Sequence, residues 1–372
     1  MKRKRIDALT GGRFFAMMLI VTSHLEFMSS TEMGKIYSRF LHNPTLGVDY
    51  FFILSGFGMM YSHLQKSKDG PEAPLNLRTM LPFAVRHVKK IYPVYLVCIG
   101  LGVIHYLLFY WFFSGDNSVN ALVLILVKAV VKIVPALLVV QSATGMSVFS
   151  NAFCGTSWFL SSLFCIQIFA PALMQLLKKH LGTTKRYIAT LILLAAGASA
   201  ATSLFAMIER CTPFDVLVYA SPYTRVFYVM FGMVLAQLFL ATSHKKVGKM
   251  EYVAIPLAGL YYLLKNELFL PSGVHYAVDI FVCGFAVYAI ASGTGVISRF
   301  LASRKLVYLG NLSMYVFLIH YLLRMYAVSI ADVLCWNGPV VAAVQCVIIV
   351  LGGYVVSAIL YKYKNSGYPW KG

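Results

Sequence analysis

The sequence predicts an all-α integral membrane protein. Hydrophobic residues make up 59% of its 372 residues, charged residues make up 12%, and the mean hydropathy is +0.74. A soluble globular domain carries about 25% charged residues, so this composition lies far outside the soluble range. The apolar residues gather in successive stretches of about 20, the length that one membrane-spanning helix requires. We therefore expect transmembrane helices to make up almost the whole chain.

Ten hydrophobic stretches are predicted to cross the membrane. They lie at residues 14–30, 46–64, 91–113, 156–177, 187–207, 219–241, 250–264, 274–292, 306–328 and 338–361. The connections between them are mostly short, and the longest that contains no apolar stretch is the region of residues 65–90. We expect a single membrane domain over residues 1–372, with no appended soluble domain.

Residues 121–140 are the ambiguous segment. They are apolar enough to cross the membrane, but Lys128 and Lys132 share one helix face and Pro135 interrupts the segment. A helix lying in the membrane interface has the same features. Composition alone therefore leaves both placements open, and the distribution of charge has to decide.

Counting the basic residues of the loops favours an interfacial helix near 121–140. If the segment does not cross, 23 of the 32 Lys and Arg fall on the side of the N-terminus and 6 on the other. If it crosses, every later loop changes sides, against the positive-inside rule. We therefore predict about ten spans with both termini cytoplasmic. The same rule explains the net charge of +19, so no nucleic-acid partner is expected.

The first stretch carries two ionisable residues, Arg13 and His24, separated by ten almost wholly apolar residues. An interval of 11 residues turns an α-helix through about three turns plus 20°, so both side chains share one face, about 16 Å apart. Arg13 is then expected at the cytoplasmic surface and His24 well inside the span, where ionisable groups are usually functional. The alternatives are an arginine that anchors the helix at the interface and a histidine that only packs.

Asp49 begins the second stretch, near the outer membrane surface, and the short loop before it returns the chain beside the first stretch. A carboxylate next to His24 would orient the imidazole and increase its basicity, as a general base requires. We therefore name His24 and Asp49 as candidate catalytic residues. Asp49 also suits the cap of its own helix, an alternative that does not exclude pairing with His24.

The opening of the chain, RIDALTGGRFFAMMLIVTSH followed by GVDYFFILSGF, resembles that of the acyltransferase-3 family of integral membrane acyltransferases. The signature of that family is an arginine, ten residues and a histidine. Three later stretches agree in the same order: AVRHVKKIYPVY, SPYTRVFYVMFGM and LGNLSMYVFLIHYLL. The resemblance thus covers nearly the whole chain.

The resemblance implies transfer of an acyl group, acetyl in the first instance and succinyl as the alternative, from cytoplasmic acyl-CoA to a hydroxyl of an envelope glycan or lipid-linked sugar. It implies that His24 is the catalytic residue and Arg13 its motif partner, which adds Arg13 to the candidate catalytic residues. Two motifs depart from the family. WFLSSLFCIQIFAP lacks the glutamates of the W-S-L-S-V-E-E motif, which makes sugar O-acetylases a weaker guide to the acceptor. The cytoplasmic R-x-x-R is only approximated by Arg86, His87, Lys89 and Lys90.

Further basic residues are candidates for substrate binding. Arg86, His87, Lys89 and Lys90 form a candidate dock for the phosphates of CoA, although a solvated positive-inside loop explains them equally well. Three residues near the outer ends of later spans are candidate contacts to the acceptor sugar or its phosphate, with packing or anchoring as the alternative. They are Arg225, and His320 and Arg324 on one helix face. His105 is expected to be structural.

Other enzyme classes leave no signature. The chain has no G-x-S-x-G elbow, P-loop or Rossmann fingerprint, and its histidines and seven cysteines lack the spacing of a metal site. The lack of such spacing predicts that no metal is bound. The resemblance to the family implies acyl-CoA as donor substrate and a multi-pass location in the bacterial cytoplasmic membrane. The alternative is a proton-coupled transporter or flippase of an envelope precursor, with His24, Asp49 and His320 as a proton relay. The lack of paired repeats with broken helices favours the enzyme.

Overall fold

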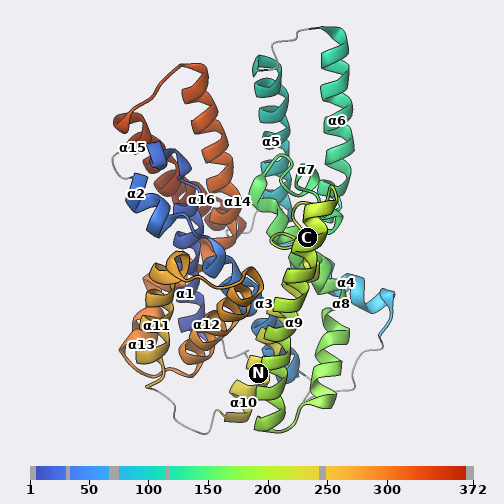
Figure 1. Ribbon diagram of the computed structural model, residues 1–372, viewed down its shortest axis with the longest axis vertical. Coiled ribbons are helices and arrows are strands. Elements are labelled where there is room, and N and C mark those ends of the chain that lie inside the picture. The colour runs from blue at the N-terminus through green and yellow to red at the C-terminus, as the bar shows by residue number, and fades with distance from the viewer. Residues whose placement is uncertain (1–5, 31–33, 67–74, 114–117, 243–248, 366–372) are drawn as a thin grey trace.

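Helices make up nearly all of the structure (Figure 1). The computed structural model describes residues 6–30, 34–66, 75–113, 118–242 and 249–365, and no strand occurs in these ranges. The longer helices are α1 (Asp7–Ser23), α3 (Thr45–Lys66), α4 (Leu77–Val88), α5 (Tyr92–Phe113), α6 (Val119–Leu137), α8 (Trp158–His180), α9 (Thr184–Cys211), α10 (Pro222–Thr242), α11 (Glu251–Leu264), α12 (Ser272–Ser292) and α14 (Arg304–Val333). The last helical run joins α15 (Pro339–Val347), the π-helix η6 (Ile348–Gly352) and α16 (Gly353–Asn365). The predicted all-α class is confirmed.

Short helical turns connect the longer helices. They are η1 (Glu26–Ser30), α2 (Gly34–Ile36), η2 (Tyr37–Leu41), η3 (Gln141–Thr144), α7 (Ser147–Ser150), η4 (Gly155–Ser157), η5 (Lys265–Glu267) and α13 (Val296–Leu301). Two of them, η1 and η4, lie next to the candidate active site described below.

Eight helices within the described residues are long and apolar enough to cross a membrane: α5, α6, α8, α9, α10, α12, α14 and the run from α15 to α16. Seven of them coincide with predicted spans. The remaining predicted spans, 14–30, 46–64 and 250–264, correspond to α1, α3 and α11, which do not belong to this group. The chain is therefore a multi-pass membrane protein, while the count of ten and the cytoplasmic termini stay predictions.

The segment predicted as an interfacial helix forms α6, which is one of the eight candidate spans. It packs beside α5 in an antiparallel pair (Figure 1). Both of its lysines lie over tyrosine rings of α5: Lys132 Nζ is 4.8 Å from the Tyr106 ring centre and Lys128 Nζ is 6.0 Å from that of Tyr110. The face of α6 that carries the two lysines is thus turned toward α5. The lysines are therefore no argument against α6 as a membrane-spanning helix.

The first helix begins and ends earlier than predicted. It covers Asp7–Ser23 instead of 14–30, so Arg13 lies in its second turn and His24 directly follows its last residue. The hydroxyls of Thr22 and Ser23 donate to the carbonyls of Met18 and Ile20, each at 2.8 Å. Such side-chain bonds compete with continuation of the helix, and η1 follows after a break of two residues. The prediction that one helix covers residues 14–30 with His24 inside it is therefore wrong, while the depth of His24 in the membrane stays a prediction.

Two pairs of helices approach closely because glycine stands at the contact. A Cβ added to Gly56 of α3 would lie 1.8 Å from the carbonyl oxygen of Val229 on α10, and one added to Gly232 of α10 would lie 1.9 Å from that of Ile53. Small residues at such contacts are a common way for membrane helices to pack backbone against backbone. The packing of α3 on α10 brings the start of α3 next to the start of α10.

Helices α1 and α14 are the second close pair, and they run in parallel. A Cβ added to Gly310 of α14 would lie 1.8 Å from the carbonyl oxygen of Thr10 on α1. Both helices advance from this contact by similar distances, so the end of α1 meets α14 again at residues 320–324. Residues nearly 300 positions apart in the sequence are thereby brought together.

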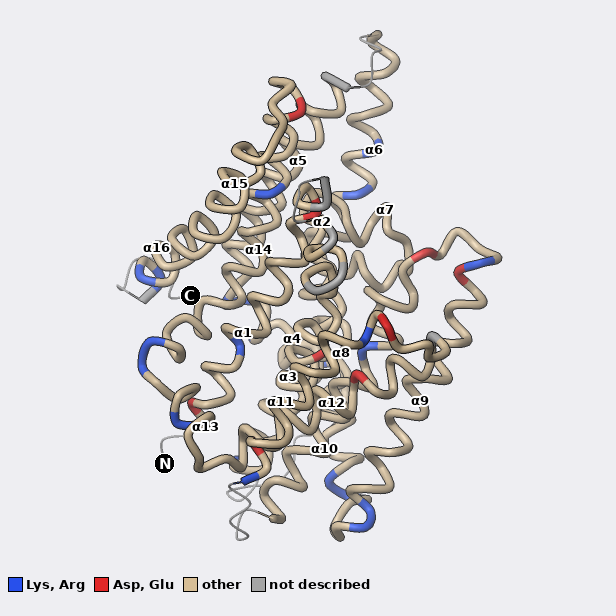
Figure 2. Tube along the Cα trace, turned by 60° about the vertical axis from the view of Figure 1, so that its left-hand side comes forward, with Lys and Arg blue, Asp and Glu red and all other residues tan. Residues whose placement is uncertain are grey.

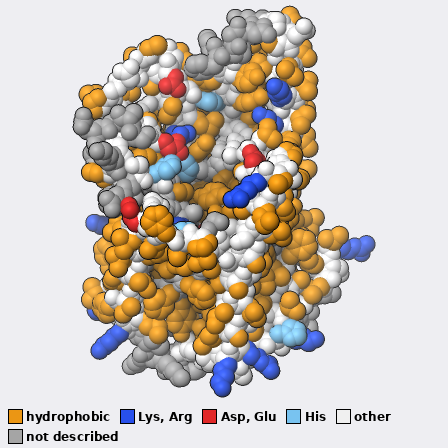
Figure 3. All heavy atoms as spheres, in the orientation of Figure 1, with side chains coloured by type: hydrophobic (Ala, Val, Ile, Leu, Met, Phe, Trp, Pro, Cys, Tyr) orange, Lys and Arg blue, Asp and Glu red, His pale blue; other side chains and the backbone are white. Residues whose placement is uncertain are grey.

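Charge is distributed unevenly over the molecule. Figure 2 shows Lys and Arg at the turn between α8 and α9 and around α13, at the same end of the molecule. This agrees with the predicted grouping of these two loops on one side of the membrane. In Figure 3 the same end is largely apolar around its circumference, while acidic, basic and His side chains gather beside a hollow between the α2–α14 side and the α5–α7 side.

Candidate active site

His24 directly follows the last turn of α1, and its ring is held in one orientation. Its Nδ1 lies 2.8 Å from the carbonyl oxygen of Ile20. Because a carbonyl oxygen only accepts, the hydrogen of a neutral imidazole must be on Nδ1. The lone pair is then on Nε2. This tautomer leaves Nε2 able to take a proton from a substrate.

His320 of α14 lies beside His24 and contacts it. The side chain is fully buried, and its Nδ1 donates to the carbonyl oxygen of Val316 at 2.7 Å, so its Nε2 carries a lone pair. That Nε2 is 3.3 Å from Nδ1 of His24, and the two ring centres are 5.2 Å apart. The hydrogen on Nδ1 of His24 therefore faces two acceptors, His320 and Ile20. His320, and not the predicted carboxylate, is therefore the side chain that contacts Nδ1 of His24.

Arg324, one turn further along α14, contacts the backbone at His24. Its Nε donates to the carbonyl oxygen of His24 at 2.9 Å, and its guanidinium forms an ion pair with Glu26. The ring of Tyr321 stands edge-on to the ring of His24, with centres 5.3 Å apart, and lies 5.5 Å from the guanidinium. The structure thus brings together His24, His320 and Arg324, which the sequence placed only on separate helices.

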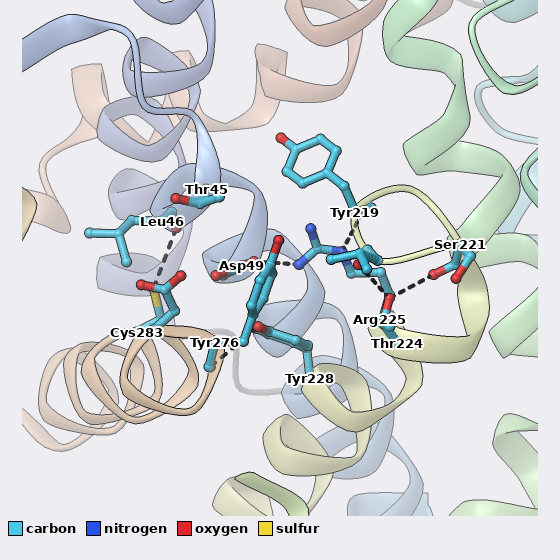
Figure 4. A network of polar contacts seen from close by, with 12 residues as sticks. Thr45, Leu46, Asp49, Tyr219, Ser221, Thr224, Arg225, Tyr228, Tyr276 and Cys283 are labelled. Carbon is cyan, nitrogen blue, oxygen red and sulfur yellow. Dashed lines mark hydrogen bonds and ion pairs between the residues drawn. The ribbon is translucent and has the colours of Figure 1, made fainter. Parts of the chain in front are cut away.

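Asp49 does not pair with His24, so that prediction is wrong. Its Oδ1 accepts a hydrogen bond from Nη1 of Arg225 at 2.7 Å, and both side chains have no exposed surface. Figure 4 shows the guanidinium of Arg225 between Asp49 and Tyr219. Nε of Arg225 donates to the backbone carbonyl oxygen of Tyr219 at 2.8 Å. The physical reason is that α3 packs on α10 and places two opposite charges together, and a buried carboxylate needs a charged partner more than a neutral ring.

Aromatic rings surround the guanidinium of Arg225. Four ring centres lie 5.0–5.8 Å from its central carbon: Phe52, Trp158, Tyr219 and Tyr228. This arrangement stabilises a desolvated cation. Oδ2 of Asp49 and Nη2 of Arg225 are buried without a hydrogen-bond partner among the described residues. The pair is therefore a charged centre inside the bundle that has no hydrogen bond to the histidines.

Comparison with known proteins identifies the family. The sequence model of the acyltransferase-3 family, described as an acyltransferase domain, matches residues 6–362. The chain belongs to the acyltransferase-3 family. The acyltransferase MdmB of Streptomyces mycarofaciens is 30% identical over 182 residues, which cover 47% of this chain and 41% of that protein. The match thus spans about two fifths of the length of that relative. No solved structure gives a significant match.

Membership of the acyltransferase-3 family gives the Arg13 to His24 spacing a chemical context, because the family model describes an acyltransferase domain. Arg13 is half-buried on α1, 11 residues before His24. Helix geometry puts about 16 Å between the two positions. Arg13 lies one to two turns from the start of α1. Because it is about 16 Å from His24, it does not belong to the cluster around His24.

The four residues predicted to dock CoA lie on the surface of this member of the family. Arg86 and His87 are in the last turn of α4, and Lys89 and Lys90 follow it; all four are exposed. Nε of Arg86 donates to the carbonyl oxygen of Pro82 at 3.2 Å, and Nδ1 of His87 donates to that of Phe83 at 2.7 Å. These side chains are accessible to a soluble anion, and their contact with CoA stays a prediction.

Sequence reasoning missed two groups of residues. Glu26 and Tyr321 contact the His24 cluster, and each lies within two residues of a predicted site residue, so proximity in the chain was an available signal. The buried pair of Lys265 with Asp279, at 2.6 Å, was missed because the two lie on separate helical elements. Within the described ranges no three His, Cys, Asp or Glu side chains gather as a metal site would require.

Proposed function

We propose that this acyltransferase moves an acyl group, acetyl in the first instance and succinyl as the alternative, from cytoplasmic acyl-CoA to a hydroxyl of an envelope glycan or lipid-linked sugar at the bacterial cytoplasmic membrane. One observation carries the proposal: Nδ1 of His24 donates to the carbonyl oxygen of Ile20, which leaves the lone pair on Nε2. A hydroxyl needs such a base to attack a thioester at neutral pH. The donor and acceptor follow from the resemblance to the family.

The proposed reaction transfers one proton through His24, from the acceptor hydroxyl to the CoA thiolate. Nε2 of His24 takes the proton of the acceptor hydroxyl as its oxygen attacks the thioester carbonyl. The carbon–sulfur bond then breaks, and the departing CoA thiolate takes the proton from the imidazolium. His320 Nε2 and the carbonyl oxygen of Ile20 both face Nδ1 and stabilise the transient positive charge. General-base catalysis of this kind contributes about 10²–10⁴-fold to the rate.

Basic residues supply the attraction for the donor. The phosphates of CoA would bind the exposed Arg86, His87, Lys89 and Lys90 at the end of α4. Arg13, between the start of α1 and His24, would contact the part of the donor nearer the thioester. Nε and Nη1 of Arg225 donate to Tyr219 and Asp49, and the side chain has no exposed surface, which supports a structural role for it in preference to direct contact with the acceptor.

The alternative hypothesis of a transporter depends on a proton relay that the geometry does not support. A proton relay through His24, Asp49 and His320 would need the three groups in sequence. Instead His320 contacts His24, whereas Asp49 bonds to Arg225 and has no hydrogen bond to either histidine. No geometric feature of the described residues favours transport over acyl transfer.

Replacing His24 tests the proposal directly. In purified protein reconstituted in nanodiscs with a lipid extract from the bacterial envelope, we expect His24→Gln to lower release of CoA from acetyl-CoA at least about 100-fold, because the base is lost. His105→Gln is the matched control: that histidine of α5 bonds to Ser329 at 2.9 Å, away from the cluster, and activity should be retained. Equal turnover by wild type and His24→Gln would exclude His24 as the base.

The acceptor class can be read from the cell envelope. Deleting the gene should remove an acetyl or succinyl mass from an envelope glycan or glycolipid, measured by mass spectrometry. Expression of the His24→Gln variant should fail to restore that mass, whereas the His105→Gln variant should restore it. An unchanged set of glycan masses in the deletion strain would contradict the proposed acceptor.

A further inference from the structure

We propose that Arg324 and Glu26 form a clamp that positions His24, which makes Arg324 a positioning residue in place of the acceptor contact suggested by the sequence. The clamp consists of the guanidinium of Arg324, the carboxylate of Glu26 and the carbonyl oxygen of His24. The inference rests on the proposed role of His24 as general base. It names how the ring of that base is held in place.

The first half of the clamp is a bond to the backbone. The last carbonyls of an α-helix have no partner within the helix and need one from elsewhere. His24 stands at that position, as the first residue beyond α1. Nε of Arg324 donates to its carbonyl oxygen at 2.9 Å. A side chain from α14 therefore holds the end of the helix that carries His24.

The second half is an ion pair with the next structural element. The same guanidinium pairs with Glu26, the first residue of η1, and the side chains of Arg324 and Glu26 are 21% and 42% exposed. One planar group thus binds residues on both sides of Leu25 and fixes the turn between α1 and η1. Lysine cannot reproduce this geometry, because its single ammonium lacks the fork of the guanidinium. A partly exposed ion pair contributes little to the free energy of folding. We therefore attribute its position beside His24 to the positioning of that residue.

The ring of His24 is held by the same turn of α14. His320 and Tyr321, four and three residues before Arg324, contact the imidazole through Nε2 and through a ring edge. The ring of Tyr321 packs closely against Gly155, since a Cβ added to that glycine would lie 2.4 Å from the ring. Residues 320–324 therefore hold both the ring and the backbone of His24.

Loss of the clamp should reduce turnover more than binding. Arg324 acts through the backbone of His24, so its removal would let Nε2 move relative to the thioester. A displacement of about 1 Å can reduce a catalysed rate about 100-fold. Acyl-CoA binding depends on other residues in the proposed function, so its KM should not change.

Three variants test the clamp with acetyl-CoA as probe, on the full chain in nanodiscs: Arg324→Lys, Glu26→Gln and the double variant. We expect each single change to lower kcat about 10- to 100-fold, with the KM for acetyl-CoA within about twofold of wild type. The double variant should be no slower than the slower single variant, because the two side chains act as one unit. Arg299→Lys is the matched control, since Nε of that exposed arginine also donates to a backbone carbonyl, that of Gly295 at 3.2 Å, and its kcat should not change.

A spectroscopic readout separates this inference from the proposed function. In ¹⁵N-histidine NMR spectra, with His24 assigned through His24→Gln, the wild type should show the neutral Nδ1–H tautomer and the clamp variants a mixture of tautomers. If wild type does not turn over acetyl-CoA while the variants still shift the tautomer, the proposed function fails and the clamp stands. If Glu26→Gln retains full kcat and the wild-type tautomer while Arg324→Lys raises only the KM of an acceptor, the clamp is excluded.

Discussion

At the scale of single residues, the buried pair of Asp49 and Arg225 constrains which substitutions the protein tolerates. Both side chains are fully buried, and one oxygen and one nitrogen of the pair have no hydrogen bond among the described residues. Removing one partner of a buried pair leaves an uncompensated charge, which costs about 3–5 kcal/mol. Removing both charges together avoids that cost. The pair is therefore more sensitive to single than to double substitution.

We expect Asp49→Asn to lower the free energy of unfolding by about 3 kcal/mol, because Arg225 keeps its charge without a counterion. The double variant Asp49→Asn with Arg225→Gln should recover a large part of that loss. Thermal unfolding in detergent, followed by tryptophan fluorescence, measures both. Asp332→Asn, at an exposed position near the end of α14, is the control and should unfold like wild type. A double variant less stable than Asp49→Asn alone would contradict this account.

At the scale of the helices, close approach decides which residues meet. Gly56 and Gly232 permit α3 and α10 to touch backbone to backbone, and this contact sets the distance between Asp49 and Arg225. Gly58, two residues after Gly56 on the same helix, has no atom within 4 Å of its added Cβ and is exposed. The two glycines of α3 therefore have different roles although the sequence does not distinguish them.

Gly232→Ala should destabilise the protein by about 1–3 kcal/mol, because its Cβ would overlap the carbonyl oxygen of Ile53 and force the helices apart. Gly58→Ala should be neutral or slightly stabilising, since alanine is the better helix former and the site is open. Thermal unfolding of the two variants under identical conditions makes the comparison. Equal losses of stability in both would show that helix propensity, and not the contact between α3 and α10, determines the effect.

At the scale of the whole molecule, the placement of α6 determines the topology of everything after it. If α6 does not cross the membrane, the connections after α9 and after α14 face the extracytoplasmic side; if it crosses, they face the cytoplasm. Cys211 and Cys335 are exposed and lie at the ends of α9 and α14. Their accessibility therefore reports the topology without any engineered site.

We expect a membrane-impermeant maleimide added to intact spheroplasts to modify both Cys211 and Cys335, as peptide mass spectrometry would show. Lys305→Cys, at an exposed position at the start of α14, is the control and should react only after the membrane is permeabilised. Protection of Cys211 and Cys335 in intact spheroplasts, combined with reaction at residue 305, would mean that α6 crosses the membrane.

The sequence by itself determined the composition-driven features: an all-α membrane protein, seven of the eight candidate spans, and the Arg13 to His24 signature of the family. These depend on local hydrophobicity and on spacing within one helix, and both can be read from the chain. The C-terminal end of α1 was misplaced because hydroxyl side chains and contacts with α14 determine where that helix stops.

Only the tertiary structure decided which polar residues meet. His24 contacts His320 across 296 positions of sequence, and Asp49 contacts Arg225 across 176. Several charged or polar partners were available to each, and the sequence contains no rule for choosing among them. The choice follows from glycine contacts between parallel α1 and α14 and between α3 and α10, because those contacts fix which helix ends lie side by side. The spacing of Arg13 and His24 is thus encoded locally, whereas the surroundings of His24 are set by packing.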